Sequence, residues 1–392
     1  MEARESERKA PADAVSSTPT TKDIWLLLSS MEPPSSKASS ESKTSIENNQ
    51  SSTEERDTFT LVVGSKSSGK TSLFNAYVHR GSDEKGGSTE EVKPTTGLEY
   101  VYVRQNGAVA HIWELASLRC VPEMMRVPLA PERILQSAVV VVIDLSNPGD
   151  AVLYLIKWLT TVYRIVNEIL KTKEKNPVEK SAVEKLRRVA LDRFGKDHAD
   201  KDDVTPIAIP VLIIGNKFDV LAQQDNLPKK PLLQALRFFA HLYGATLLLT
   251  TTKEKPCVNQ MRGVFKSYIF GMTGNLKNSK KDVDSASKPH FVPVGSDSFS
   301  EIGLPDGARK EDLFGPVNDV DAKAKPWKKY LAKVIEPSGS VTDDWDIGDD
   351  KGKTPESDYP EPNIDRARQR KLDELTRYRD ARKKMADKGK RG

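Results

Sequence analysis

The stretch that decides the fold reads FTLVV-GSKSSGKT-S and runs from Phe59 to Ser72. Its first five residues, Phe59 to Val63, have the composition of a buried strand, and an amphipathic helical segment follows Ser72. Between them, Gly64–Thr71 matches the pattern G-x-x-x-x-G-K-[ST] in the strand-to-helix context that this pattern requires. The sequence therefore predicts a loop whose backbone N–H groups point at phosphate oxygens.

Two side chains of this loop have individual expected roles. Lys70 is expected to bridge the β- and γ-phosphates, and the hydroxyl of Thr71 is expected to bind Mg²⁺. The complete set of expected phosphate contacts is Gly64, Ser65, Lys66, Ser67, Ser68, Gly69, Lys70, Thr71 and Ser72.

A second pattern, downstream, identifies the base. Val211–Ile214 predicts a buried strand, and Asn216, Lys217 and Asp219 follow it as N-K-x-D. The Asp219 carboxylate can accept hydrogen bonds from N1–H and the exocyclic amine of guanine, whereas adenine would leave it mispaired at a cost of about 1–3 kcal/mol. Guanine is therefore favoured. A weaker match, TTTK at 250–253, adds Thr252 and Lys253 to the candidate base site.

The residues around the expected γ-phosphate bear on hydrolysis. Thr95 precedes the second expected strand and is a candidate ligand of Mg²⁺, and so is Glu114, through a water molecule. Glu114 stands where a D-x-x-G motif would begin, while Ser117 replaces its glycine and Leu118 replaces a water-orienting glutamine. No side chain in this stretch positions an attacking water, so we expect GTP hydrolysis to be slow or absent.

Apolar runs that alternate with helical periodicity predict an α/β domain at 58–271 with a mostly parallel central sheet. The expected strands are Phe59–Val63, Leu98–Arg104, Val109–Leu115, Ala138–Asp144, Ala208–Ile214 and Ala245–Thr250. The expected helices are Gly69–His79, Asp150–Lys171, Leu232–Tyr243 and Asn259–Phe270, with an inserted charged helix at Pro177–Phe194.

The regions around this domain differ from it in composition. Residues 1–57 are expected to be mostly disordered, because ten of the twenty residues in Pro34–Thr53 are Ser or Thr. Within them, 21–31 is a short docking segment centred on Trp25. Residues 272–337 are expected to wrap the core, 338–363 to form an acidic flexible linker, and 364–388 to form a charged helix. Leu375 and Tyr378 lie on the apolar stripe of that helix, which could serve a partner.

Composition and charge exclude several classes. Of the 392 residues 37% are apolar and 30% are charged, and no segment offers the roughly 20 nearly uncharged residues of a bilayer span, so we expect no membrane insertion. Ile364–Gly392 holds twelve Lys and Arg and five Asp and Glu, a net +7, which leaves −2 of the total +5 for the other residues. We therefore expect no direct nucleic-acid contact. Cys120 and Cys257 cannot supply a disulfide framework.

The long helix expected at Asp150–Lys171 is apolar on more than one side. One interpretation is that Ile156, Tyr163 and Leu170 form an exposed flank that binds a large partner. The alternative is that the inserted helix and the 272–337 extension cover this flank.

The chain resembles the light intermediate chains of cytoplasmic dynein, and in particular the dynein-2 form that serves retrograde intraflagellar transport. The matching residues in the first half are Gly64–Thr71, Lys93–Thr95, Leu98–Tyr100 and His111–Leu115. Those in the second half are Leu236–Phe238, Ala240–His241, Tyr243–Ala245, Asp297–Phe299, Ile302–Gly303 and Trp327–Lys329. The complete N-K-x-D departs from the family's usual degenerate pattern and favours a retained nucleotide.

The resemblance implies a Ras-like, P-loop GTPase-type domain in a non-catalytic subunit. Its implied partners are the dynein-2 heavy chain, through its tail, and other dynein-2 subunits, and its implied role is cilium assembly. The implied location is the cytoplasm, the cytoskeleton and the cilium or flagellum, including axoneme and basal body. GDP or GTP with Mg²⁺ would fill the site if it is occupied, and an empty site remains open. The alternative function is an active guanine-nucleotide switch that regulates transport.

Overall fold

The computed structural model describes residues 57–78, 95–116, 124–224, 226–276, 279–283, 288–308, 320–335 and 366–378 apart from 368. The docking segment with Trp25 and the acidic linker lie outside these residues. Within them, one sheet has seven strands in the order β2-β3-β1-β4-β5-β6-β7. The strands are β1 (Asp57–Gly64), β2 (Leu98–Gln105), β3 (Ala108–Leu115), β4 (Ser137–Asp144), β5 (Val211–Asn216), β6 (Thr246–Leu249) and β7 (Phe291–Val292).

Only the two edge strands of this sheet run antiparallel to their neighbours. β2 pairs with β3 through a hairpin at Asn106-Gly107, where both residues have positive φ. β7 pairs with β6 at the other edge. The four remaining pairs are parallel, which confirms the predicted α/β fold with a mostly parallel sheet.

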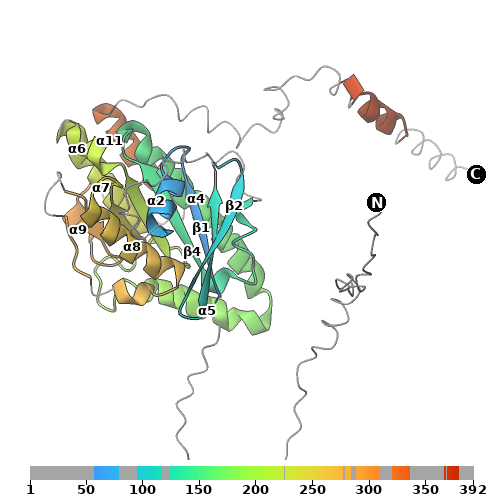
Figure 1. Ribbon diagram of the computed structural model, residues 1–392, viewed down its shortest axis with the longest axis horizontal. Helices are drawn as coiled ribbons and strands as arrows, with labels where there is room; N and C mark the ends of the chain where they lie inside the picture. The colour runs from blue at the N-terminus through green and yellow to red at the C-terminus, as the bar shows by residue number, and fades with distance from the viewer. Residues whose placement is uncertain are drawn as a thin grey trace, which may run out of the picture. The chain divides into compact units, whose positions relative to one another are not determined.

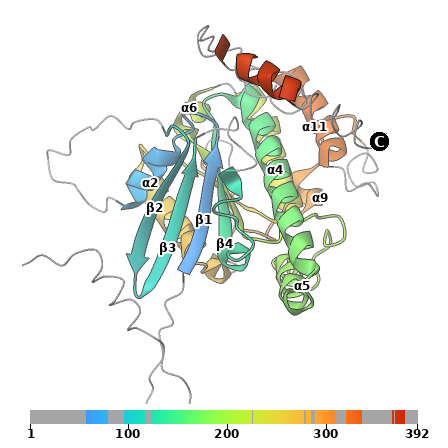
Figure 2. The same cartoon turned by 90° about the vertical axis from the view of Figure 1, so that its right-hand side faces the viewer.

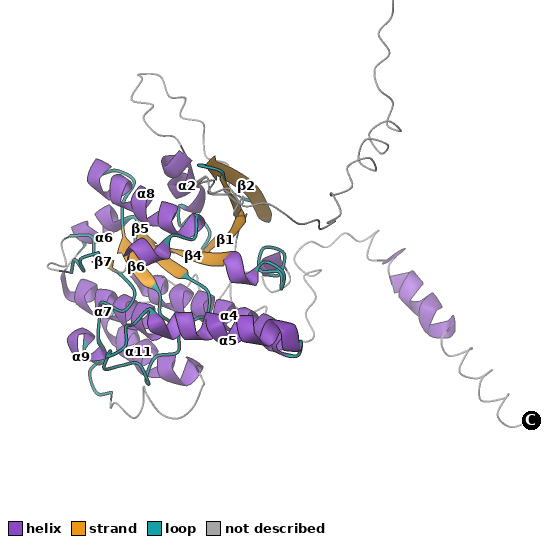
Figure 3. Cartoon of the chain, turned by 90° about the horizontal axis from the view of Figure 1, so that it is seen from below, coloured by secondary structure: helices purple, strands orange, loops and turns teal. Residues whose placement is uncertain are grey.

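Helices cover both faces of the sheet (Figure 3). α2 (Lys70–Val78) and α8 (Lys255–Ile269) pack on one face, and α4 (Pro148–Glu174) and α7 (Asn226–Leu242) on the other. The further helices are α5 (Pro177–Asp192), α6 (Phe218–Gln223), α9 (Phe299–Ile302) and α11 (Val320–Val334) (Figure 1). None of the helices in the described ranges is both long and apolar enough to cross a membrane.

The central position of β1 places the phosphate loop. β1 lies between β3 and β4, and its side chains from Thr60 to Val63 are buried on both faces, with Leu61 toward α4 and Val62 toward α8. A continuous apolar run is what a doubly covered parallel strand needs. Its last residue, Gly64, therefore stands at the middle of the carboxyl edge of the sheet, where ligands of open α/β sheets bind.

The fifth strand is shorter than its sequence suggests. Ala208 was expected to begin it, yet β5 starts at Val211. The Arg193 guanidinium donates hydrogen bonds to the carbonyl oxygens of Ile207, Ala208 and Ile209, at 2.7–3.2 Å. These carbonyls are thus bound to a side chain rather than to a neighbouring strand.

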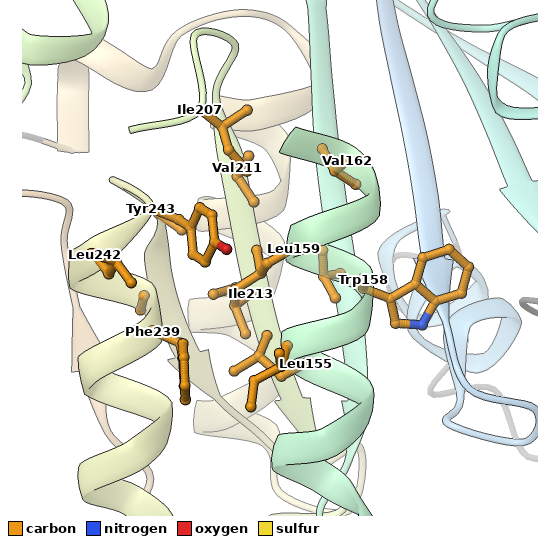
Figure 4. Close-up of a cluster of buried hydrophobic side chains, with 14 of the residues drawn as sticks. Leu155, Trp158, Leu159, Val162, Ile207, Val211, Ile213, Phe239, Leu242 and Tyr243 are labelled. Carbon is orange, nitrogen blue, oxygen red and sulfur yellow. The ribbon is translucent and has the colours of Figure 1, made fainter. Parts of the chain in front are cut away.

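Of the two interpretations of α4, the exposed flank is wrong for Ile156 and Leu170, whereas Tyr163 is half-buried. Ile156 and Leu170 are 1% and 0% exposed, and the ring of Tyr163 meets that of Tyr243 edge to face at 6.0 Å. α5, α7 and α11 all contact α4, as the alternative interpretation stated for the inserted helix and the extension. Figure 4 shows the core that results between α4, β5 and α7.

A buried ion pair holds the segment after α8 against α7. Asp297, whose side chain is 2% exposed, accepts two hydrogen bonds from Arg237, at 2.7 and 2.8 Å, and one from Lys281 at 3.1 Å. Burial alone would raise the pKa of Asp297, but these cations outweigh it and hold the pKa below the ordinary value.

The helix α11 is also held against α7. Its Trp327 is fully buried against Phe238, with ring centroids 5.2 Å apart.

Ile156→Asp is expected to lower the free energy of unfolding by roughly 4 kcal/mol, because it places a charge in a sealed core. The matched control is Val178→Asp, since Val178 is 85% exposed in the first turn of α5. The control should stay within about 0.5 kcal/mol of the wild type. Urea unfolding followed by circular dichroism measures both, and equal stabilities of the two variants would contradict the burial of this flank.

Asp297→Asn is expected to cost roughly 3 kcal/mol at pH 7, because Arg237 is left without its countercharge. The pKa of Asp297 is lower in the folded chain, so the wild-type advantage is present above the unfolded value of about 4. It is lost as pH falls through the lower, folded value. Unfolding curves at pH 7 and pH 3 measure it, and a difference that widens toward acid would contradict this sign.

Candidate nucleotide site

The phosphate loop is curled tightly, and two glycines permit it. A Cβ on Gly64 would lie 2.2 Å from the Val142 carbonyl oxygen. Gly69 has φ of +90°, and a Cβ there would lie 2.3 Å from the Asn216 amide nitrogen. Side chains are therefore excluded at both positions, and the loop passes directly into the N-terminus of α2.

Lys70 lies at the floor of this loop and is 6% exposed. Its ammonium group donates to the carbonyl oxygens of Ser65 and Ala116, both at 3.1 Å, and to that of Gly64 at 3.4 Å. Burial lowers the pKa of Lys70, and the nearby Glu114 carboxylate opposes this shift. The loop thus surrounds the Lys70 ammonium group with backbone carbonyl oxygens. A positive charge at this point is what the expected role of Lys70 in phosphate binding needs.

The three expected magnesium ligands come together. One Glu114 carboxylate oxygen accepts hydrogen bonds from Thr71 at 2.7 Å and from Thr95 at 2.9 Å. The two hydroxyl oxygens are 3.4 Å apart, and Glu114 is 8% exposed. Converging hydroxyl and carboxylate oxygens are the donors that Mg²⁺ prefers, so these residues fit the ion.

The base loop is joined to the phosphate loop. The Asn216 amide, 3% exposed at the end of β5, donates to the Ser68 carbonyl at 2.9 Å. Lys217 follows in the left-handed region, with φ of 61°, and its ammonium group pairs with Asp144 at the end of β4. These contacts align the two loops at the same edge of the sheet.

Asp219 is held by the loop after β6. One of its carboxylate oxygens accepts from Thr251 at 2.7 Å, and the other pairs with Lys253 at 2.6 Å. Burial alone would raise the pKa of Asp219, but the hydrogen bonds from Lys253 and Thr251 lower it below the ordinary value. An ionised carboxylate here is the acceptor that guanine needs. The Lys253 side chain is 72% exposed, so water competes for it and it can leave the carboxylate.

Sequence reasoning missed two residues of this site. Thr251 lies within the TTTK match but outside the predicted base site, although its hydroxyl donates to Asp219, whereas the predicted Thr252 is exposed. Asp144 is the last residue of an expected strand but is absent from the predicted site. Its pairing with Asn216 across β4 and β5 is the signal that could have placed it beside the base loop.

The remaining expected site residues have mixed outcomes. Ser117 and Leu118 lie outside the described residues. Leu375 and Tyr378 are 50% and 67% exposed, and their role as a partner face stays a prediction. Exposed loop positions are Lys66 and Ser67, while Ser65 and Ser72 are half-buried.

A group of possible metal ligands at His198, Asp200 and His241 does not form a metal site. Both ring nitrogens of His198 are engaged, with the Asp297 carbonyl at 2.9 Å and with the Asp200 backbone N–H at 3.2 Å. Asp200 in turn accepts from the Phe299 backbone N–H at 2.8 Å and lies 3.0 Å from His241. The group connects the 198–200 loop to α7 and α9 as a packing bridge.

Comparison with known proteins identifies the family. A family model described as dynein light intermediate chain matches residues 36–195. Cytoplasmic dynein 2 light intermediate chain 1 of Bos taurus is 30% identical over 361 residues, which cover 88% of this chain and 93% of the relative. The chain belongs to the dynein light intermediate chain family.

Other members fall into two groups. The dynein 2 protein of Homo sapiens is 29% identical over 327 residues, covering 82% of this chain and 87% of the relative. Cytoplasmic dynein 1 light intermediate chain 1 of Homo sapiens is 24% identical over 278 residues, covering 62% and 51%. A crystal structure of the dynein light intermediate chain's conserved domain aligns with a TM-score of 0.47 at 16% identity, covering 73% of this chain and 93% of that one.

Asp219→Asn is expected to weaken GDP binding by roughly 10- to 100-fold, because an amide donor then faces the exocyclic amine of guanine. Binding of xanthosine diphosphate should strengthen, since its 2-oxo group accepts from the same amide. Thr172→Ala, at an exposed threonine near the end of α4, is the control and should change neither affinity more than twofold. Isothermal titration calorimetry of the wild type and both variants, with each of the two nucleotides, measures these affinities. Unchanged GDP binding by Asp219→Asn would contradict the assignment of the base site.

Proposed function

We propose that this chain is a light intermediate chain subunit of the cytoplasmic dynein-2 motor. In this role it binds the tail of the dynein-2 heavy chain and supports retrograde intraflagellar transport and cilium assembly. The observation that carries the proposal is the match to dynein-2 light intermediate chains, which extends through nearly the whole sequence. The match to dynein-1 relatives is shorter and weaker, which favours the dynein-2 motor.

The nucleotide site supports a structural role for the bound group within this subunit. We propose that GDP or GTP with Mg²⁺ binds between the phosphate loop and Asp219, and that it is not turned over. Bound at a hundredfold excess over its dissociation constant, a nucleotide would stabilise the fold by about 2.7 kcal/mol. Glu114 holds both threonine hydroxyls, and the sequence supplies Ser117 and Leu118 where a hydrolytic site needs glycine and glutamine.

The competing function is a working guanine-nucleotide switch. The intact N-K-x-D and the convergence of Thr95 with Thr71 and Glu114 favour it, because a switch needs both base selectivity and a γ-phosphate contact. The two functions differ in what the heavy chain detects. A switch binds it differently with GDP and GTP, and a scaffold does not.

Co-purification from ciliated cells of the same organism tests the proposal. Tagged chain is expected to retain the dynein-2 heavy chain and to locate to the cytoplasm, basal body and axoneme. Its depletion is expected to shorten cilia and to leave retrograde cargo at their tips. Recovery of the dynein-1 heavy chain instead would contradict the assignment to dynein-2.

Lys70→Ala is expected to reduce the amount of bound guanine nucleotide at least tenfold, because it removes the buried cation of the phosphate loop. Heavy-chain recovery should stay within twofold of the wild type if the site is structural. Lys185→Ala, at an exposed lysine of α5, is the control and should retain nucleotide. Mass spectrometry of released nucleotide and quantitative blotting measure the two effects, and parallel loss of nucleotide and heavy chain would favour the switch.

A further inference from the structure

Three lysine side chains of α11 line a hollow on the surface of the domain. Lys325, Lys329 and Lys333 follow one another at intervals of four residues, so they lie on one side of the helix. Together with Tyr330 and the loop at 306–308 they border an open hollow of about 420 Å³. We call these three lysines, Tyr330 and this loop the lysine hollow.

The other side of α11 holds the helix in place. Ala324 and Trp327 are fully buried, and Leu331 is 8% exposed. α11 contacts α7 and α4, and Figure 2 shows it beyond α4, on the opposite side from β2 and β3. Because one side of the helix is fixed in the core, the other side is presented in a constant orientation. The three lysines therefore form a standing row.

The positive charge of the lysine hollow is not balanced by the described part of the chain. Its three lysines are exposed, and none of them forms an ion pair with a described residue, whereas Lys323 of the same helix donates to Thr205 at 3.3 Å. Of the described residues that line the hollow, Asp306 alone carries a carboxylate, which leaves a net charge of about +2. Like charges four residues apart repel each other. An occupant with several carboxylates would relieve this repulsion.

The sequence supplies such an occupant directly after α11. Ser338–Asp350 holds five Asp and no Lys or Arg, with Trp345 among the acids. Asp343, the first of the five, follows the end of α11 at Val334 by nine residues. Nine residues reach up to about 30 Å. The acidic run can therefore turn back and lie along the helix that precedes it.

The acidic run and the lysine row match in length. Along the helix Lys325–Lys333 is about 12 Å long. In an extended chain Asp346–Asp350 is about 13 Å long. Laid along the row, the acidic run brings carboxylates to the lysines and Trp345 near the half-buried ring of Tyr330. Contact between two aromatic rings adds apolar area to the ion pairs.

We propose that the acidic run Ser338–Asp350 docks in the lysine hollow of the same chain, with its carboxylates paired to Lys325, Lys329 and Lys333. Exposed ion pairs are individually weak. A segment tethered by nine residues has an effective concentration in the millimolar range, so weak contacts suffice. A separate acidic peptide would also lose translational freedom on binding. The inference goes beyond the proposed function and does not depend on it, since both surfaces belong to this chain.

Docking shortens the connection between the domain and the terminal helix. The connection expected at 338–363 is reduced to 351–363, which is half its length. The average span of a flexible chain grows as the square root of its length, so it falls from about 28 Å to about 20 Å. The docked run thus limits how far the exposed Leu375 and Tyr378 reach from the domain.

Zero-length cross-linking of the purified full-length chain tests the inference, because a carbodiimide joins an amine to a carboxylate only where the two are in contact. We expect links from the lysines of the hollow to Asp343–Asp350, and their yield should fall roughly threefold between about 50 mM and about 500 mM NaCl. The ion pair of Lys281 and Glu301 is the internal standard. An equal mixture of ¹⁵N-labelled and unlabelled chain shows whether each link lies within one chain.

Charge reversal separates a specific contact from general attraction. Lys329→Glu combined with Lys333→Glu is expected to reduce the links of the remaining Lys325 to the acidic run at least fivefold, because the row then repels the run. The control combines Lys185→Glu with Arg188→Glu, which makes the same change of charge at exposed positions of α5. The control should leave the links within twofold of the wild type.

Exchange of the charges completes the test. Asp346→Lys and Asp349→Lys, added to the lysine variant, should restore links between the run and α11, with the amine now on the run. The inference is overturned if this exchange restores nothing, or if the hollow lysines do not link to the run while Lys281 links to Glu301. It is equally overturned if the links join only labelled to unlabelled chains, or if the lysines link to a different acidic part of the chain.

Discussion

The hydrogen bond from the Asn216 amide to the Ser68 carbonyl is the contact on which the arrangement of the site depends. It joins two loops that are 148 residues apart in the sequence. The bond forms only because Gly69 lacks a Cβ and because β1 and β5 end at the same edge, with β4 between them. Sheet order, a glycine and an asparagine are therefore parts of one constraint, and a change in any of them would separate the phosphate loop from Asp219.

The same edge of the sheet shows where this chain differs from the D-x-x-G pattern of a hydrolytic GTPase. Thr71 and Thr95 both donate to a single oxygen of Glu114. A glutamate reaches one methylene further than the aspartate of a D-x-x-G motif, so its carboxylate can contact both hydroxyls at once. The chain has side chains that suit phosphate, Mg²⁺ and guanine, whereas the sequence that follows Glu114 lacks a side chain that would orient water. This combination is why we propose a structural rather than a signalling role for a nucleotide in the site.

Much of the fold followed from the sequence because its signals are local. Gly64–Thr71 and N-K-x-D have fixed spacings, and the central strands are uninterrupted apolar runs. Other features depend on contacts far apart in the chain. Ile156 and Leu170 lie on a helix that is apolar on more than one side, and periodicity cannot say which distant helix covers each side. Asp144 lies beside Asn216 through the pairing of β4 and β5, and Thr251 reaches Asp219 from the loop after β6. The two-residue strand β7 is too short for a pattern. The rings of Phe59, His111 and Tyr102 are adjacent only in the register of β1, β2 and β3.

We propose that a Ras-type nucleotide site has been kept as a structural element of a motor subunit. This can be tested by releasing and quantifying the nucleotide bound to the purified full-length chain, and then following labelled GTP under single-turnover conditions. We expect a bound guanine nucleotide and no conversion of GTP to GDP above the rate in buffer. Steady hydrolysis that disappears in Lys70→Ala, or an adenine nucleotide in the site, would contradict it.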